Sequence, residues 1–296
     1  MRYYHQLIIG ISLFCSSLAH AVDFYADALY WQASETVDWA LTNNRSVPNH
    51  IISYKTIDFN FAPGFRVGAG FQNKDWNSRF LYTRYNVRAN ASTQGNVVSA
   101  FMASKFISLF YNTAQVDFSI DFNTFDADLY KTIHVGDSLI LNPIIGLRGG
   151  WINQTVKASY QTSFNVVETT TNNFSGFGPK VGIDSRWDFY KKNDYQYSLL
   201  ADFSGSFMWG KWSINDVLTQ SNSLQLSYVN VGKRDFGALA VQVFIGINLD
   251  YKNYALKFGY EVADWFNQYQ AFDNATGGHS NDLILQGLTV GFNYHW

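Results

Sequence analysis

Apolar and polar side chains alternate with a period of two in long stretches of the chain. In residues 57–72, one face carries Ile57, Phe59, Phe65 and other apolar residues, and the opposite face carries charges, amides and glycines. The same pattern recurs in 176–189, 239–251 and 254–262. This alternation predicts β-strands, and the longest runs exceed the about five or six residues typical of a strand in a soluble sandwich. Long strands with one apolar and one polar face are typical of a transmembrane β-barrel.

The connections alternate between short turns and long polar stretches. Short turns are predicted at 73–76, 135–138, 191–194 and 251–253, and long loops at about 34–56, 89–112, 160–175, 213–235 and 267–281. The chain is therefore expected to form an all-β, antiparallel transmembrane β-barrel with short periplasmic turns and long extracellular loops. About ten strands are predicted: 22–33, 57–72, 77–88, 113–133, 139–158, 176–190, 195–212, 236–251, 254–266 and 282–296.

Residues 96–112 do not fit a simple loop. Val98, Met102, Phe106 and Phe110 recur at helical spacing and are too apolar for an exposed connection. The alternatives are a short helix, a loop tucked into the barrel mouth, or two additional strands that would bring the total to about twelve.

The first residues have the features of a secretory signal peptide. Arg2 precedes an apolar run from Leu7 to Phe14, and the segment ends in the small-x-small sequence Ala19-His20-Ala21. The run is shorter than the ~20 residues of a spanning helix. We expect a signal peptide at 1–21 and a single outer-membrane barrel domain at 22–296. The one cysteine, Cys15, lies inside the signal peptide, so the mature chain would contain neither a disulfide nor a thiolate nucleophile.

Charge and aromatic content refine this picture. Without Arg2, 20 basic residues stand against 23 acidic ones, a net charge of −3 that gives no reason to expect a nucleic-acid partner. Aromatic residues make up 18% of the chain. Many of them, including Trp31, Trp151, Trp212 and Trp265, lie near predicted strand ends, which predicts girdles at the two membrane interfaces.

Charged residues on the polar faces are the candidate functional residues. By alternation, the predicted pore-lining residues are Asp58, Arg66, Arg84, Arg148, Lys180, Asp184, Arg186, Asp202, Lys257 and Glu261. Two interpretations compete for them. The charges could shape the field inside an open channel, or they could pair into a closed polar plug, because a buried charge needs a partner. Ten-stranded barrels are narrow enough to permit either interpretation.

The last eleven residues carry an apolar stripe of Leu288, Val290, Phe292, Tyr294 and Trp296. We expect this strand to face lipid and to pair with the first strand, so that the barrel has no free edge. The stripe is also the predicted C-terminal assembly signal for the barrel-assembly machinery.

Several blocks resemble the Legionella-type major outer membrane protein family. They are 26–34, 63–71, 81–87, 141–154, 172–189 and 286–294, and the string Pro143-x-x-Gly146-Leu147-Arg148-Gly149-x-Trp151-Ile152 is the most specific. The resemblance implies a porin-like barrel in the cell outer membrane. Members of that family often carry cysteines thought to cross-link the envelope, and the mature chain departs from this pattern.

The predicted function is passive diffusion of small hydrophilic solutes through a porin, without enzymatic activity, cofactor or metal. A non-conducting adhesin or structural barrel is the alternative. A rim-located enzyme is disfavoured because the histidines His50, His134, His279 and His295 form no Asp-x-His pair. The expected partners are outer-membrane lipid, lipopolysaccharide and the assembly machinery, and a homo-oligomer is left open.

Overall fold

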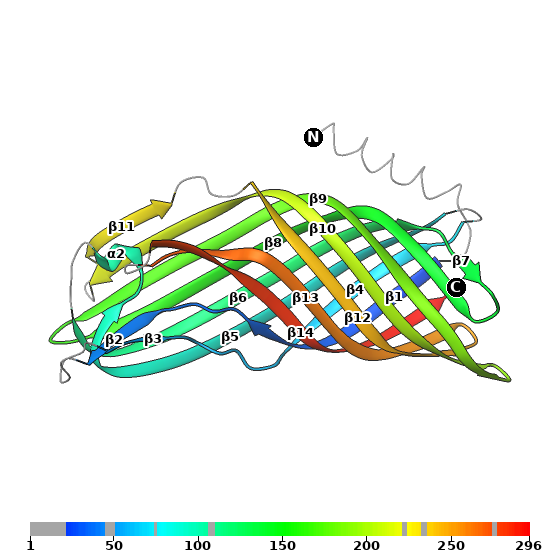
Figure 1. Ribbon diagram of the computed structural model, residues 1–296, viewed down its shortest axis with the longest axis horizontal. Helices are drawn as coiled ribbons and strands as arrows, with labels where there is room; N and C mark the ends of the chain where they lie inside the picture. Colours follow the sequence, from blue (N-terminus) through cyan, green and yellow to red (C-terminus); the bar gives the residue numbers. More distant parts are fainter. Residues whose placement is uncertain are drawn as a thin grey trace, which may run out of the picture.

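Ten antiparallel strands close into one barrel in the computed structural model (Figure 1). The structure describes residues 22–44, 51–73, 76–105, 110–220, 224–231, 236–273 and 277–296. The predicted signal peptide lies outside them. In order around the wall, the strands are β1 (Val22–Ser34), β4 (Ala62–Phe71), β5 (Asn77–Ser99), β6 (Tyr111–Tyr130), β8 (Leu139–Gln161), β9 (Asn165–Lys192), β10 (Tyr195–Gln220), β12 (Gly237–Tyr251), β13 (Tyr254–Asp273) and β14 (Gly277–His295).

The first and last strands close the barrel. β1 pairs with β4 on one side and with β14 on the other, where Asp23 lies opposite His295 and Ser34 opposite Ile284. Backbone hydrogen bonds between Val22 and Trp296 complete the seam, at 3.1 Å and 2.9 Å. The predicted pairing of the two chain ends is therefore confirmed.

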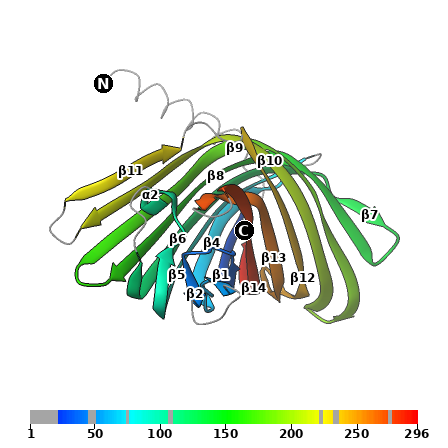
Figure 2. The same cartoon turned by 60° about the vertical axis from the view of Figure 1, so that its left-hand side comes forward.

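Four shorter strands lie at the two ends of the barrel, outside the ten-stranded wall. β2 (Ala40–Asn44), β3 (Ile51–Lys55), β11 (Gln225–Val231) and helix α2 (Met102–Lys105) lie at the end opposite the C-terminus, whereas β7 (Ile133–Val135) lies at the C-terminal end (Figure 1). Figure 2 brings the end with α2 and β11 forward. The prediction of ten wall strands is confirmed, because these pieces belong to connections. The short-helix alternative for 96–112 is also correct for Met102–Lys105. No described helix is long and apolar enough to cross a membrane.

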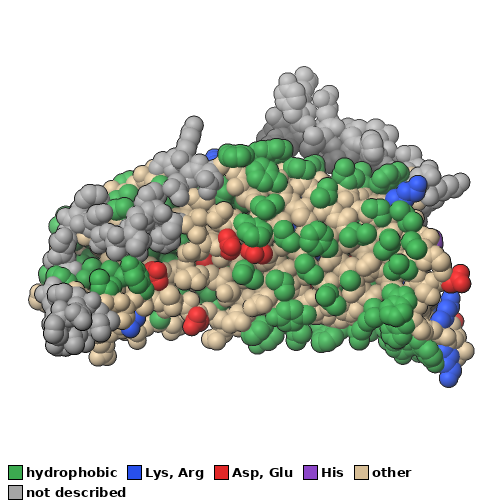
Figure 3. All heavy atoms as spheres, in the orientation of Figure 1, with side chains coloured by type: hydrophobic (Ala, Val, Ile, Leu, Met, Phe, Trp, Pro, Cys, Tyr) green, Lys and Arg blue, Asp and Glu red, His purple; other side chains and the backbone are tan. Residues whose placement is uncertain are grey.

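The strands are much longer than a membrane requires. A transmembrane strand needs about 9–11 residues, whereas β9 has 28 and β10 has 26. Exposed apolar residues such as Phe177, Val181 and Trp187 occupy only the part of β9 nearest the short turns. Hydrophobic side chains cover the central and right-hand part of the surface in Figure 3. This band is the membrane-spanning section, and β9 and β10 continue beyond Phe177 and Trp209 into an outer section.

Most of the predicted long loops are therefore strand. Residues 160–175 reduce to a turn at Thr162–Phe164, because β8 runs to Gln161 and β9 starts at Asn165. Thr169 and Thr171 take the outward positions of this part of β9, whereas the polar residues between and beside them, Glu168, Thr170 and Asn172, are buried on the inner face. The polar composition therefore predicted neither the strand nor the burial of every second residue.

Candidate functional site

The inner face of the barrel changes character along its axis. On β1, Asp23, Tyr25 and Asp27 point inward near the short-turn end, and Leu29 and Trp31 follow on the same face. β14 shows the same change. Of its buried residues, Thr289 lies nearer the short-turn end, and Leu285 and Leu283 lie nearer the outer end. The interior is thus mainly polar within the membrane-spanning section and mainly apolar within the outer section, where the buried acids Glu35, Glu168 and Asp216 are exceptions.

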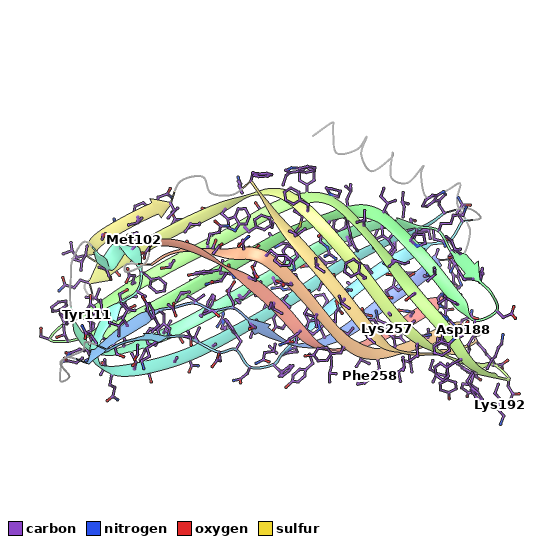
Figure 4. All side chains as sticks on the ribbon, viewed as in Figure 1. Met102, Tyr111, Asp188, Lys192, Lys257 and Phe258 are labelled. Carbon is purple, nitrogen blue, oxygen red and sulfur yellow. The ribbon has the colours of Figure 1, made fainter. Side chains whose placement is uncertain are left out.

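The polar part contains a chamber of about 250 Å³. Its lining extends from Arg66 and Arg148 near mid-barrel to Arg186, Asp250 and His295 at the short-turn end. Lys257 and Asp188 lie on this side of the barrel, opposite Met102 and Tyr111 (Figure 4). Because short turns mark the periplasmic side of such barrels, the chamber belongs to the periplasmic half.

A chain of ion pairs crosses the chamber from β13 to β1 and β4. Lys257 Nζ lies 2.9 Å from Asp27 Oδ2, and Arg66 Nη1 lies 3.3 Å from the same oxygen. Arg66 Nη2 also donates to Glu261 Oε1 over 2.6 Å. Asp27 and Glu261 are 5% and 1% exposed, so these charges lie away from bulk water and depend on one another.

Gln242 links this first group of ion pairs, which contains Glu261, to a second group, which contains Arg148. Its amide nitrogen donates to Glu261, and its Oε1 accepts from Arg148 Nη2 over 2.7 Å. Arg148 in turn holds Asp126 through two hydrogen bonds, of 2.6 Å and 2.9 Å.

The second group continues around the wall. Lys180 lies between Asp126 and Asp128, at 3.2 Å and 3.0 Å, and Arg79 joins Asp128 to Asp184, at 3.0 Å and 2.9 Å. Most of the charged residues that line the chamber are therefore paired with one another, as the plug interpretation predicts.

Aromatic residues cover this paired layer on its outer side. A cavity of only about 10 Å³ is bordered by Arg66 and Arg148 and by the rings of Trp31, Phe122 and Trp265. A space of this size holds about one water molecule. The Arg66 guanidinium lies 5.7 Å from the centroid of the Trp31 ring, and Phe122 contacts Trp265 edge-to-face at 5.3 Å.

Beyond these rings the outer section is filled by a hydrophobic core. Its largest fully buried members are Trp31, Trp39, Tyr85, Tyr111, Phe118, Ile120, Ile152, Tyr160, Phe174, Met208, Trp265 and Tyr269. Side chains from different wall strands meet there, as Phe118 of β6 does with Tyr269 of β13 at 6.0 Å between ring centroids. The described side chains thus pack across the bore in the way of an ordinary protein core.

Two buried carboxylates bind the segment around helix α2 at the outer end of the barrel. Glu168 accepts hydrogen bonds from Ser99 Oγ and from both N and Oγ of Ser104, and Asp216 accepts from Ala103 N over 2.7 Å. Both acids lie in the outer section. Burial, and then the neighbouring Asp216, raises the pKa of Glu168 to about 8, and burial raises the pKa of Asp216 to about 6.

The structure places eight of the ten predicted pore-lining residues in or against the chamber. They are Arg66, Arg148, Lys180, Asp184, Arg186, Asp202, Lys257 and Glu261. Whether they line a conducting pore is a separate question, because seven of them take part in ion pairs.

The predictions for Asp58 and Arg84 were wrong. Both side chains are exposed on the outside, and their neighbours Ile57, Phe59 and Tyr85 point inward instead. The reason is the apolar core of the outer section, where the hydrophobic face of a strand is the inner one. The same reversal explains why Trp31, Trp212 and Trp265 are buried, whereas Trp151, Trp187 and Trp209 are exposed as girdle residues would be.

Several members of the network were missed. Asp27, Arg79, Asp126, Asp128 and Gln242 all point inward and bind the predicted charges. A usable signal existed for three of them. Asp126 and Asp128 alternate with the exposed Phe125 and Leu129, and Asp27 lies on the strand face opposite to that of the exposed Phe24 and Tyr30.

The C-terminal stripe faces outward as predicted for most of its length. Leu288, Val290 and Phe292 are 39–46% exposed, Tyr294 is half-buried, and Trp296 lies just beyond the end of β14. Its role as an assembly signal stays a prediction.

The histidines do not form a metal site among the described residues. His295 Nδ1 lies 2.7 Å from Asp23 Oδ1 at the periplasmic rim, and His134 is exposed in β7. His50 and the His279 side chain lie outside the described part. No group of three or more potential metal ligands occurs within the described ranges.

Comparison with known structures finds other outer-membrane barrels. The outer membrane protease OmpT from Escherichia coli shares 12% identity, with 95% of this chain and 98% of that chain covered and a TM-score of 0.48. A major outer membrane protein from Thermus thermophilus shares 10%, with 94% and 100% covered and a TM-score of 0.40. Likeness at this level carries no argument about activity.

Sequence comparison is more specific. No curated protein sequence matches the chain. The family model described as Legionella pneumophila major outer membrane protein precursor matches residues 15–296, which is nearly the whole chain. Together with the closed ten-stranded barrel, this match shows that the chain belongs to the Legionella major outer membrane protein family and resides in the outer membrane.

Proposed function

We propose that the protein is a non-conducting outer-membrane barrel that displays its long outer section at the cell surface, in a structural or adhesive role. The observation that carries this proposal is the layer formed by Trp31, Phe122 and Trp265 over the paired charges of Arg66 and Arg148. A hydrophilic solute would have to leave water, separate buried ion pairs and then cross a packed apolar core. Each of these steps is unfavourable.

The outer section suits surface display. Its strands pair continuously beyond the membrane, as β9 and β10 do from Trp209–Phe177 to Gln220–Val166. Their outward positions carry polar side chains, including Thr155, Lys157, Thr169, Thr171 and Lys211. A hydrophobic core inside and polar residues outside give this section the rigidity of a soluble β-domain.

A porin for small hydrophilic solutes is the second candidate. It is favoured by the charged chamber of about 250 Å³, whose lining includes six lysine or arginine residues and six acidic residues. In this case the apolar layer would have to rearrange to connect the chamber to the outside. The family membership agrees with either candidate.

Liposome swelling distinguishes the two functions. Liposomes containing the full-length mature protein are diluted into isotonic solutions of a pentose, a hexose and a disaccharide. The proposal predicts the swelling rate of protein-free liposomes for every sugar. Swelling that is faster for smaller sugars would establish the porin and reject a permanently closed barrel.

A further inference from the structure

The barrel wall contains a polar pocket of about 200 Å³ at the outer edge of the membrane-spanning section. It forms because β1 loses its partner there. The last β1–β4 pair is Trp31–Ala62, and beyond it residues 32–36 face the irregular segment 56–59. Gln32 Nε2 donates to the carbonyl oxygen of Phe59 over 2.7 Å and closes the base of the opening.

The pocket lies just beyond the lipid-facing pair Tyr30 and Leu288, in the direction of the outer section. Tyr30 lies opposite Leu288 in the β1–β14 register, and both are exposed, at 52% and 39%. The next outward pair is Gln32 and Gln286, and both residues line the pocket. This change from apolar to amide side chains places the pocket at the level of the lipid headgroups in the outer leaflet.

An aromatic surface adjoins the pocket on its membrane side. The rings of Tyr30 and Phe61 stack at 5.3 Å with an interplanar angle of 21°, and Phe61 is 43% exposed. Such rings can contact acyl chains and the apolar faces of sugar rings. They would hold a lipid next to the opening.

The lining favours hydroxyl groups over phosphate. Gln32, Ser34, Thr36, Thr56 and Gln286 offer both donors and acceptors. Asp58 is the exposed acidic residue of the lining, whereas Glu35 is buried and its carboxylate accepts hydrogen bonds from Gln154; the lining includes neither lysine nor arginine. An anionic phosphate would therefore meet the Asp58 carboxylate and no cation, whereas sugar hydroxyls can satisfy the polar groups.

We propose that this pocket binds the sugar headgroup of an outer-leaflet glycolipid, with the lipid chain lying along Tyr30, Phe61 and Leu288. The assignment commits to a membrane lipid as the source of the sugar, because the pocket continues directly into the apolar surface. It does not depend on whether the barrel conducts.

The test uses the full mature chain in dodecylphosphocholine micelles, with dodecyl maltoside as the glycolipid probe. Native mass spectrometry measures the fraction of protein that retains a maltoside. The variant Ser34→Leu/Gln286→Leu blocks the pocket, and Tyr30→Leu removes the ring while keeping an apolar side chain. Ser175→Leu is the matched control, because Ser175 is exposed one outward step beyond Phe177 on β9.

We expect the pocket variant to retain about tenfold less maltoside than the wild type, equivalent to losing one or two hydrogen bonds. Tyr30→Leu should weaken retention, and Ser175→Leu should leave it unchanged. Resistance to urea and circular dichroism show that each variant is folded. Equal retention by the wild type and a folded pocket variant would overturn the proposal. Full displacement of the probe by equimolar free maltose would also overturn it, because the lipid chain would then contribute nothing.

Discussion

The Arg66 guanidinium donates to the Glu261 carboxylate over 2.6 Å and thereby joins β4 to β13 inside the membrane-spanning section. The two residues are 195 positions apart in the chain and are 8% and 1% exposed. Arg66 reaches Asp27 through its other amino group, and Glu261 also accepts from Thr289 Oγ1 over 2.9 Å. This pair therefore connects strands on both sides of the β1–β14 seam.

Breaking this pair should destabilise the barrel. Arg66→Met leaves the buried Glu261 carboxylate without its ion-pair partner, and we expect it to lower the free energy of unfolding by about 3–5 kcal/mol. Glu261→Gln should cost less, because Arg66 keeps its ion pair with Asp27. The double variant Arg66→Met/Glu261→Met should recover a large part of this loss, because neither charge remains buried alone. Urea unfolding in lipid vesicles, followed by tryptophan fluorescence, measures the change. Single variants as stable as the wild type would show that the pair is well hydrated.

Gly287 is expected to be required for the close approach of β14 to β1. Its φ is +156°, and a Cβ at this position would lie 2.2 Å from the Tyr30 carbonyl oxygen. Gly287→Ala should therefore slow folding and lower stability, because the obstructing atom belongs to the backbone. Gly205→Ala is the matched control, since a Cβ there meets no atom within 4 Å. Folding yields from urea into vesicles should fall for the first variant only.

The contact between Glu168 and the helix α2 segment should weaken as the pH rises. The pKa of Glu168 is raised from 4.5 to about 8, so the packed state binds its proton more tightly than an opened loop does. The stabilisation is therefore fully present below about pH 4.5 and is lost as the pH approaches 8. Hydrogen-exchange protection of the Ala103 and Ser104 amides, corrected for intrinsic rates, should fall over this range.

The variant Glu168→Gln provides the control for that experiment. It keeps an oxygen that can accept from Ser104 but cannot titrate. Its protection should stay nearly constant between pH 5 and 8, apart from the contribution of Asp216, whose pKa is about 6. An equally steep fall in this variant would assign the pH dependence to other groups.

The C-terminal stripe should be needed for assembly. Truncating the chain after Gly287 removes the stripe from Leu288 to Trp296, and with it eight of the twelve β1–β14 residue pairs and the backbone hydrogen bonds to Val22. We expect the protein to accumulate in the periplasm and not in the outer membrane, as measured by membrane fractionation and surface protease access. Normal insertion would show that the stripe is not a recognition signal.

Much of the barrel could be predicted because side-chain alternation is strict where one strand face meets lipid. Phe177, Val181 and Trp187 show this phase plainly, and the ten strands and the inward position of Lys180 and Asp184 follow from it. The apolar core of the outer section could not be predicted in this way. There the inner face is the hydrophobic one, so Ile57 and Tyr85 resemble lipid-facing residues and Asp58 and Arg84 resemble lumen residues.

The ion pairs between side chains of different strands could not be predicted from the sequence either. Arg66 and Glu261 meet only because β1 pairs with β14 when the barrel closes, which brings the flanking strands β4 and β13 close to each other. Alternation assigns each residue to a face, but it does not say which charges lie at the same height along the axis. This is why the sequence left the open channel and the closed plug as equal alternatives.

Single-channel recording in planar bilayers tests the closed interior most directly. We predict that the wild-type barrel gives no stepwise conductance at any voltage, because the rings of Trp31, Phe122 and Trp265 and the apolar core beyond them close the bore. Regular steps from the wild-type protein would contradict the account.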